Sequence, residues 1–98
     1  MIGVFDIGGT GWRTATANLK FEILNLKYGE TSSNYKEGIL RLISSLKASG
    51  AEGKFEKIAG CIAGVIDQNT GKLIKSPNLL DWVGKPLRED LEKEFQLA

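Results

Sequence analysis

The sequence contains no histidine among its 98 residues, and this absence excludes several kinds of site. Without an imidazole the chain cannot form a Ser-His-Asp triad, a Cys-His pair or the usual zinc sites. It has a single cysteine, Cys61, which excludes an internal disulfide and favours the reducing cytoplasm as its location. Since Cys61 lies in an apolar run, we expect it to be a small buried core residue.

Long apolar runs and an excess of one charge are also missing. No stretch approaches the ~20 apolar residues that are needed to span a bilayer. Thirteen lysines and arginines face twelve acidic residues, for a formal charge of +1, and the two signs are interspersed. We therefore expect neither a membrane partner nor a nucleic-acid partner, because the latter requires a basic patch.

The most informative feature that is present is a glycine-rich turn near the start. An apolar strand over residues 1–5 precedes Asp-Ile-Gly-Gly-Thr at residues 6–10, and a second strand follows. Gly8 and Gly9 allow a tight turn with positive φ and let backbone N–H groups approach an anion closely. Thr10 adds a hydroxyl, and Asp6 can hold a magnesium ion beside the anion. The pattern favours phosphate, although an isolated pentapeptide of this kind is also compatible with an ordinary hairpin turn.

Better-known phosphate loops do not fit the sequence. A Walker loop needs a glycine at Ile66, before Gly71, and a serine or threonine at Leu73. The dinucleotide fingerprint needs a third glycine at Thr14 and a helix afterwards, where a strand is expected. The remaining interpretation of the glycine-rich stretch is a strand-turn-strand hairpin that binds phosphate.

Periodicity predicts the elements that follow the turn. They are strands over 12–18 and 21–28, helices over 35–48 and 85–95, and, between the helices, a strand over 58–66 that leads into a hairpin turn over 67–71. Asn34 and Glu37 have the spacing of a capping box, and Gly50 is expected to end the first helix. The run over 58–66 is apolar without alternation, which is typical of a parallel strand covered on both faces. Gly71 is the expected positive-φ residue of the hairpin.

Four spaced motifs resemble the ROK family (repressors, open reading frames and kinases) of the actin, Hsp70 and sugar kinase superfamily. The matching stretches are residues 6–10 (first phosphate motif), 62–67 (G-x-P-G-x-V-D, with Ala63 in place of the proline), 67–73 (D-x-x-T-G turn) and 77–87 (P-N-L-x-x-W-x-x-x-P-L). The resemblance implies an α/β fold: a partial ribonuclease H-like (actin-like ATPase) domain with a three-stranded antiparallel meander, a helix, a buried parallel strand, a hairpin and a C-terminal helix. Residues 1–98 would form the N-terminal part of the first lobe, an incomplete domain.

The resemblance also implies an activity, the ATP-dependent phosphorylation of a hexose, with ATP and magnesium as cofactors. The implied phosphate and magnesium residues are Asp6, Gly8, Gly9 and Thr10, with Asp6 as the metal residue, and the implied sugar-side residues are Gly64, Gly71, Asn78 and Leu79. Glucose is the favoured sugar, while mannose, fructose and N-acetylated hexosamines stay open. An Asx turn after Pro77 is an equal explanation of Asn78, and core packing is the favoured explanation of Trp82.

The chain departs from the family because it has no Glu-Asn-Asp-Ala motif, whose aspartate is the family's catalytic base. We therefore expect no catalytic residue within the chain and a base beyond Ala98. The family's zinc cluster, second phosphate motif and adenosine pocket are missing too. These departures predict a chain that is inactive alone, that needs the missing C-terminal part or a complementary chain, and that dimerises or otherwise self-associates. The alternatives are the sugar-sensing portion of a ROK repressor and a non-catalytic interaction module.

Overall fold

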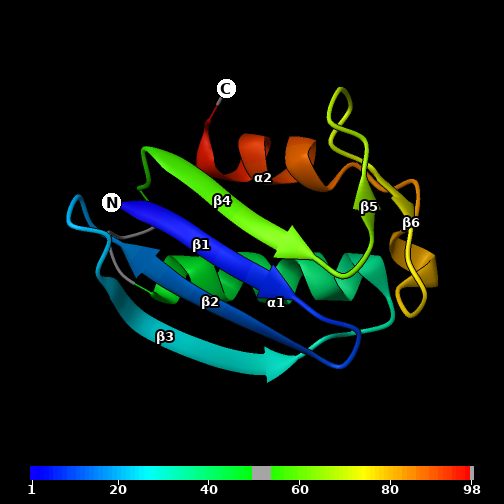
Figure 1. The fold of residues 1–98 in the computed structure, drawn as a ribbon, viewed down its shortest axis with the longest axis horizontal. Coiled ribbons are helices and arrows are strands. Elements are labelled where there is room, and N and C mark those ends of the chain that lie inside the picture. The colour runs from blue at the N-terminus through cyan, green and yellow to red at the C-terminus, as the bar shows by residue number, and fades with distance from the viewer. Residues whose placement is uncertain (50–53, 98) are drawn as a thin grey trace.

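A four-stranded sheet with two helices against it forms the body of the protein (Figure 1). The computed structural model describes residues 1–49 and 54–97. Its elements are β1 (Ile2–Ile7), β2 (Gly11–Ala17), β3 (Ile23–Glu30), α1 (Tyr35–Ala48), β4 (Lys57–Ile62), β5 (Val65–Ile66), β6 (Leu73–Lys75), the 3-10 helix η2 (Leu80–Trp82) and α2 (Leu87–Phe95). No helix among the described residues is long and apolar enough to cross a membrane.

The sheet has the strand order β3-β2-β1-β4. Strands β1, β2 and β3 form an antiparallel meander, and β4 then pairs in parallel with β1. A parallel pair requires a crossover, and α1 supplies it between β3 and β4. The predicted α/β fold is confirmed, with the meander, the helix, the parallel strand, the hairpin and the C-terminal helix in the expected order.

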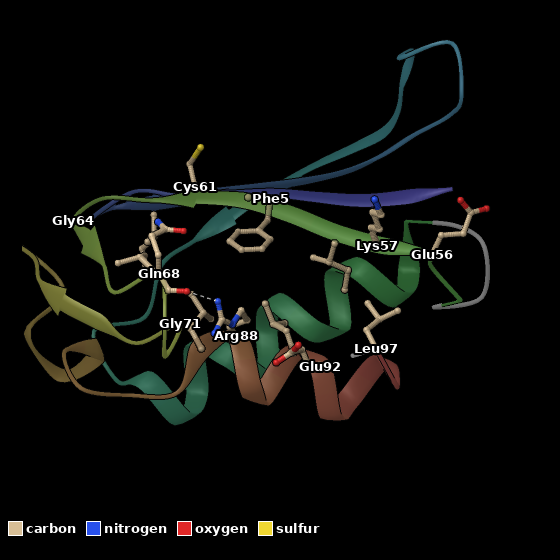
Figure 2. A pocket seen from close by; sticks show the side chains of 16 residues that line it. Phe5, Glu56, Lys57, Cys61, Gly64, Gln68, Gly71, Arg88, Glu92 and Leu97 are labelled. Carbon is tan, nitrogen blue, oxygen red and sulfur yellow. Dashed lines mark hydrogen bonds between the residues drawn. The ribbon is translucent and has the colours of Figure 1, made fainter.

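The apolar run over 58–66 does not form one strand, and the expectation that it is covered on both faces is wrong. It divides into β4, at the edge of the main sheet, and β5, which pairs with β6 in a separate hairpin. Both helices lie on the same side of the sheet in Figure 2, so β4 has one uncovered face and one unpaired edge. Cys61 is accordingly exposed, not buried, and points away from the helices (Figure 2).

Helix α1 begins with a modified version of the expected cap. Asn34 Oδ1 accepts a hydrogen bond from the Glu37 backbone N–H at 2.9 Å, as predicted. The carboxylate of Glu37 does not return to Asn34; it accepts from the Ser32 hydroxyl at 3.4 Å, and Ser32 Oγ accepts from the Asn34 N–H at 3.1 Å. Ser32 thus bridges the Asn34 backbone and the Glu37 carboxylate, which bond directly in a standard capping box. Gly50, the predicted stop, lies outside the described residues.

The core fills the space between the helices and the sheet. Its largest buried side chain is Trp82, whose ring meets that of Tyr35 edge to face with centroids 5.2 Å apart. Aliphatic and aromatic residues of both helices complete the cluster, among them Ile39, Leu42, Leu46, Leu87, Leu91 and Phe95. Trp82 is therefore a core residue, as the sequence favours, and it anchors the segment 76–86 to α1.

Candidate functional site

The glycine turn connects β1 to β2 through residues 8–10. The Gly8 N–H donates to the Gly11 carbonyl at 2.8 Å, and the Thr31 N–H supports the turn from the next connection by donating to the Thr10 carbonyl at 3.0 Å. Among the described residues, the glycines with positive φ are Gly64, Gly71 and Gly84. The expectation of positive φ at Gly8 and Gly9 is wrong, because neither is among these glycines; the turn closes through the Gly8–Gly11 hydrogen bond without it.

Close packing, not backbone conformation, explains the glycine at position 9. A Cβ atom added to Gly9 would lie 2.8 Å from Asn78 Cβ and 3.0 Å from Asn78 Nδ2. Real Cβ atoms do not approach other carbon atoms this closely, so any side chain would push the two loops apart. The fold thus places Asn78, an expected sugar-side residue, directly against the expected phosphate turn.

Asp6 lies near the end of β1, and its side chain is about half exposed. Its Oδ2 atom accepts a hydrogen bond from Arg13 Nη2, and the two residues stand directly opposite each other in the β1–β2 register. The hydrogen bond and the charge of Asp6 raise the pKa of the Arg13 guanidinium above its ordinary value. Sequence reasoning missed Arg13, although a hairpin centred on residues 9 and 10 already places position 13 opposite position 6.

The residues around the turn fit a magnesium ion that is held mainly by phosphate oxygens. No group of three or more acidic, cysteine or histidine side chains gathers anywhere in residues 1–49 and 54–97. Asp6 offers one accessible carboxylate, and magnesium commonly takes one or two carboxylates together with substrate phosphates and water. Asp6 thus offers one ligand for a magnesium ion that phosphate oxygens would also hold, and no larger ligand cluster is present among the described residues.

The four expected sugar-side residues separate into two groups. Asn78 is exposed beside Gly9, and Leu79 follows it but is only 1% exposed, so its side chain belongs to the core. Gly64 and Gly71 instead line an open groove between β4 and α2 (Figure 2). The structure thus puts Asn78 in contact with the glycine turn, while Gly64 lies beside Ser76 and Gly71 packs on Arg88.

The groove between β4 and α2 has a volume of about 710 Å³ and a mostly apolar lining. The side chains that form it include Phe5, Ile58, Ile62, Ile66, Leu87 and Leu91. Phe5 points into the groove, and a Cβ atom at Gly60 would lie 2.5 Å from the Phe5 ring (Figure 2). An apolar groove beside the unpaired edge of β4 is suited to an extended segment that adds another strand.

Helix α2 holds the turn between β5 and β6. Arg88 donates from Nη1 to the Gln68 carbonyl at 2.9 Å and from Nη2 to the Asn69 carbonyl at 2.7 Å. Within the turn, the Asn69 N–H donates to Asp67 Oδ1 at 2.9 Å, and this hydrogen bond lowers the pKa of the Asp67 carboxyl. Gly71 has φ 71°, which confirms the predicted positive φ. The Asp67 carboxylate thus forms part of the turn itself.

The antiparallel meander, the helix and the parallel strand, with a glycine turn between the first two strands, match the N-terminal part of the actin-like kinase fold. The sequence pattern of the ROK family matches residues 1–98, and the chain belongs to this family. A search of curated protein sequences finds no significant match.

Solved structures show the same relationship. A ROK family glucokinase from Streptomyces griseus, in complex with glucose and AMPPNP, matches 98% of this chain with a TM-score of 0.79 and 24% identity. A ROK family protein from Streptococcus pneumoniae, in complex with sucrose, matches 99% with a TM-score of 0.82 and 26% identity. A ROK hexokinase from Thermus thermophilus matches 99% with a TM-score of 0.81 and 19% identity. The chain spans about a third of each of these proteins: 31%, 32% and 33%.

Proposed function

We propose that this chain is the N-terminal part of the first lobe of a cytoplasmic ATP-dependent hexose kinase, to which it supplies the phosphate hairpin and part of the sugar cleft. Glucose is the proposed sugar, and ATP with magnesium is the proposed phosphoryl donor. Membership of the ROK family supports the proposal, as does the glucose and AMPPNP bound by the similar Streptomyces griseus enzyme.

The contact between Gly9 and Asn78 is the observation that carries the proposal. Phosphoryl transfer requires the attacking hydroxyl and the transferred phosphoryl group to lie next to each other and in line. The resemblance assigns Gly9 to the phosphates and Asn78 to the sugar, and the fold puts the two residues in contact.

Each residue of the turn has a distinct role in the proposal. The backbone of Gly8 and Gly9 and the hydroxyl of Thr10 approach the phosphates, and Asp6 helps to hold the magnesium ion. When bound, magnesium neutralises negative charge on the phosphates. The Asn78 amide offers both donors and an acceptor for sugar hydroxyls.

Neither of the two aspartates considered, Asp6 and Asp67, is free to act as the base for the sugar hydroxyl. Asp6 is engaged by Arg13, and Asp67 accepts a hydrogen bond within the β5–β6 turn. General base catalysis needs a carboxylate within hydrogen-bond reach of the hydroxyl proton. We therefore place the base beyond Ala98 and expect the isolated chain to be inactive.

Ligand-induced amide shifts in the ¹⁵N-labelled chain test the proposed function. Mg·AMPPNP is expected to shift the amides of residues 8–11, and glucose is expected to shift that of Asn78. Because the proposal assigns the adenosine pocket to another part of the kinase, affinities in the millimolar range are expected, about 4 kcal/mol of binding. Sugar-dependent ADP release by the chain should stay at background. Shifts confined to other surfaces would contradict the assigned sites, and turnover that is lost in Asp6→Ala would contradict the proposed inactivity.

We also propose that the open edge of β4 accepts the complementary part of the kinase, and that the purified chain associates with itself in its absence. The edge strand is apolar apart from Lys57, and Ala59, Gly60 and Cys61 are exposed. Light scattering is expected to show a mass that grows with protein concentration, because unpaired flat strands associate. Ala59→Lys should reduce the association, since a charge on an edge strand opposes pairing. A concentration-independent monomer would refute the idea.

A further inference from the structure

We propose that Arg13 is a phosphate-binding residue, placed beside Asp6 so that one guanidinium holds the carboxylate and also binds a phosphate oxygen of the nucleotide. The inference rests on the proposed function, because it takes the turn over residues 8–10 as the phosphate site. Arg13 lies outside the motif that predicts this turn, and the pairing of β1 with β2 sets it opposite Asp6.

Arg13 and Asp6 share the uncovered face of the sheet. Side chains alternate between the two faces along a strand, and Phe5, the residue before Asp6, points toward α2 in Figure 2. Cys61 pairs with Asp6 in the register of β4 and points the opposite way, away from the helices (Figure 2). The Asp6–Arg13 pair therefore faces solvent, two residues beyond Gly11, where the turn ends.

The guanidinium of Arg13 has N–H donors that remain available for a ligand. A guanidinium carries five N–H donors, and within the described part of the chain Arg13 uses only Nη2, toward Asp6 Oδ2. Its side chain is 56% exposed, so the remaining donors can reach a ligand. Arg88 is different, because two of its nitrogens bind the carbonyls of Gln68 and Asn69. The fork of Arg13 matches the geometry of a phosphate group.

The positive charge of Arg13 beside Asp6 should affect the binding of an anion and of a bare cation in opposite directions. An exposed ion pair contributes little to fold stability, so the fold has little need of this one. The guanidinium attracts an anionic polyphosphate but repels a bare divalent cation at Asp6. Removing its charge should therefore weaken the binding of a polyphosphate and strengthen the binding of a metal ion alone. A residue that only shaped the hairpin would change both affinities in the same direction.

The test compares the wild-type chain with Arg13→Gln, which removes the charge and keeps a polar side chain. Inorganic tripolyphosphate with magnesium is followed by the amide shifts of residues 8–11, and Mn²⁺ alone by paramagnetic broadening around Asp6. We expect the Kd for tripolyphosphate to rise about five- to tenfold. The Kd for Mn²⁺ should fall by roughly two- to fivefold. Arg13→Lys should recover part of the tripolyphosphate affinity, because it restores the charge without the planar fork.

Arg41→Gln is the matched control, because it removes another exposed arginine that is paired with an acidic residue, Glu37 on α1, remote from the turn in sequence. It should leave both affinities unchanged. Equal tripolyphosphate affinities for the wild type and Arg13→Gln would contradict the role of Arg13. They would not contradict the binding of phosphate by the turn over residues 8–10. If tripolyphosphate does not shift the amides of residues 8–11 in the wild type, both the proposed phosphate site and the proposed role of Arg13 are wrong. If Arg13→Gln binds both tripolyphosphate and Mn²⁺ more weakly than the wild type, Arg13 has only a structural role.

Discussion

Replacing Trp82 by alanine is expected to lower the free energy of unfolding by about 3–5 kcal/mol, the usual cost of removing a large buried aromatic side chain. The indole is 2% exposed, packs edge to face on Tyr35, and donates from Nε1 to the Ser32 carbonyl at 3.0 Å. The cost comes from lost burial, an empty cavity and an unpaired carbonyl. Since small domains are stable by only ~5–15 kcal/mol, this loss removes a large share of the free energy of unfolding.

Urea denaturation followed by circular dichroism measures this effect. Trp82→Phe is the matched variant: it keeps an aromatic ring against Tyr35 but removes the indole N–H donor, and we expect it to cost about 1–3 kcal/mol. The segment 76–86, which carries Asn78, should lose its position against the glycine turn in the alanine variant. A loss below about 1 kcal/mol for Trp82→Ala would contradict the assignment of Trp82 to the core.

Replacing Gly71 by alanine is expected to cost about 3 kcal/mol, through two separate effects. Its φ of 71° is unfavourable for a residue with a side chain, by about 1–2 kcal/mol. A Cβ atom there would also overlap Arg88 Cβ, far inside van der Waals contact, and would force the hairpin away from α2. Overpacking of this kind typically costs about 1–3 kcal/mol.

Gly84→Ala separates the two effects. Gly84 has a similar φ of 81°, but a Cβ atom added to it would meet nothing within 4 Å. We therefore expect Gly84→Ala to show the conformational cost alone, about 1–2 kcal/mol, and Gly71→Ala to exceed it by at least about 1 kcal/mol. Thermal unfolding of the two variants under the same conditions makes the comparison. Equal losses would contradict the close packing of the hairpin on Arg88.

Local patterns predicted much of this protein because their causes lie within a few residues. Asn34 caps α1 since its side chain reaches the N–H of Glu37 in the first turn. Gly71 takes positive φ because a short hairpin needs it there. The Asp-Ile-Gly-Gly-Thr stretch indicated the family through its order with the later motifs, and the family match over residues 1–98 confirms that membership.

Expectations about burial failed where they depended on distant elements. Cys61 lies in an apolar run, yet it is exposed, because both helices cover the other face of the sheet and β4 stands at its edge. The positive φ expected at Gly8 and Gly9 was also wrong, because the turn closes locally through the Gly8–Gly11 hydrogen bond. What excludes a side chain at Gly9 is Asn78, which is remote in sequence and adjacent only in the folded chain.

The sequence by itself thus determined the family, the α/β fold, the order of the elements and the position of the glycine turn, since periodicity, caps and turn residues act locally. Only the tertiary structure decided which distant residues meet: Asn78 with Gly9 across two loops, and Arg88 with the hairpin that it holds. Such contacts depend on strand register and on the packing of distant segments, and no short stretch of sequence specifies either.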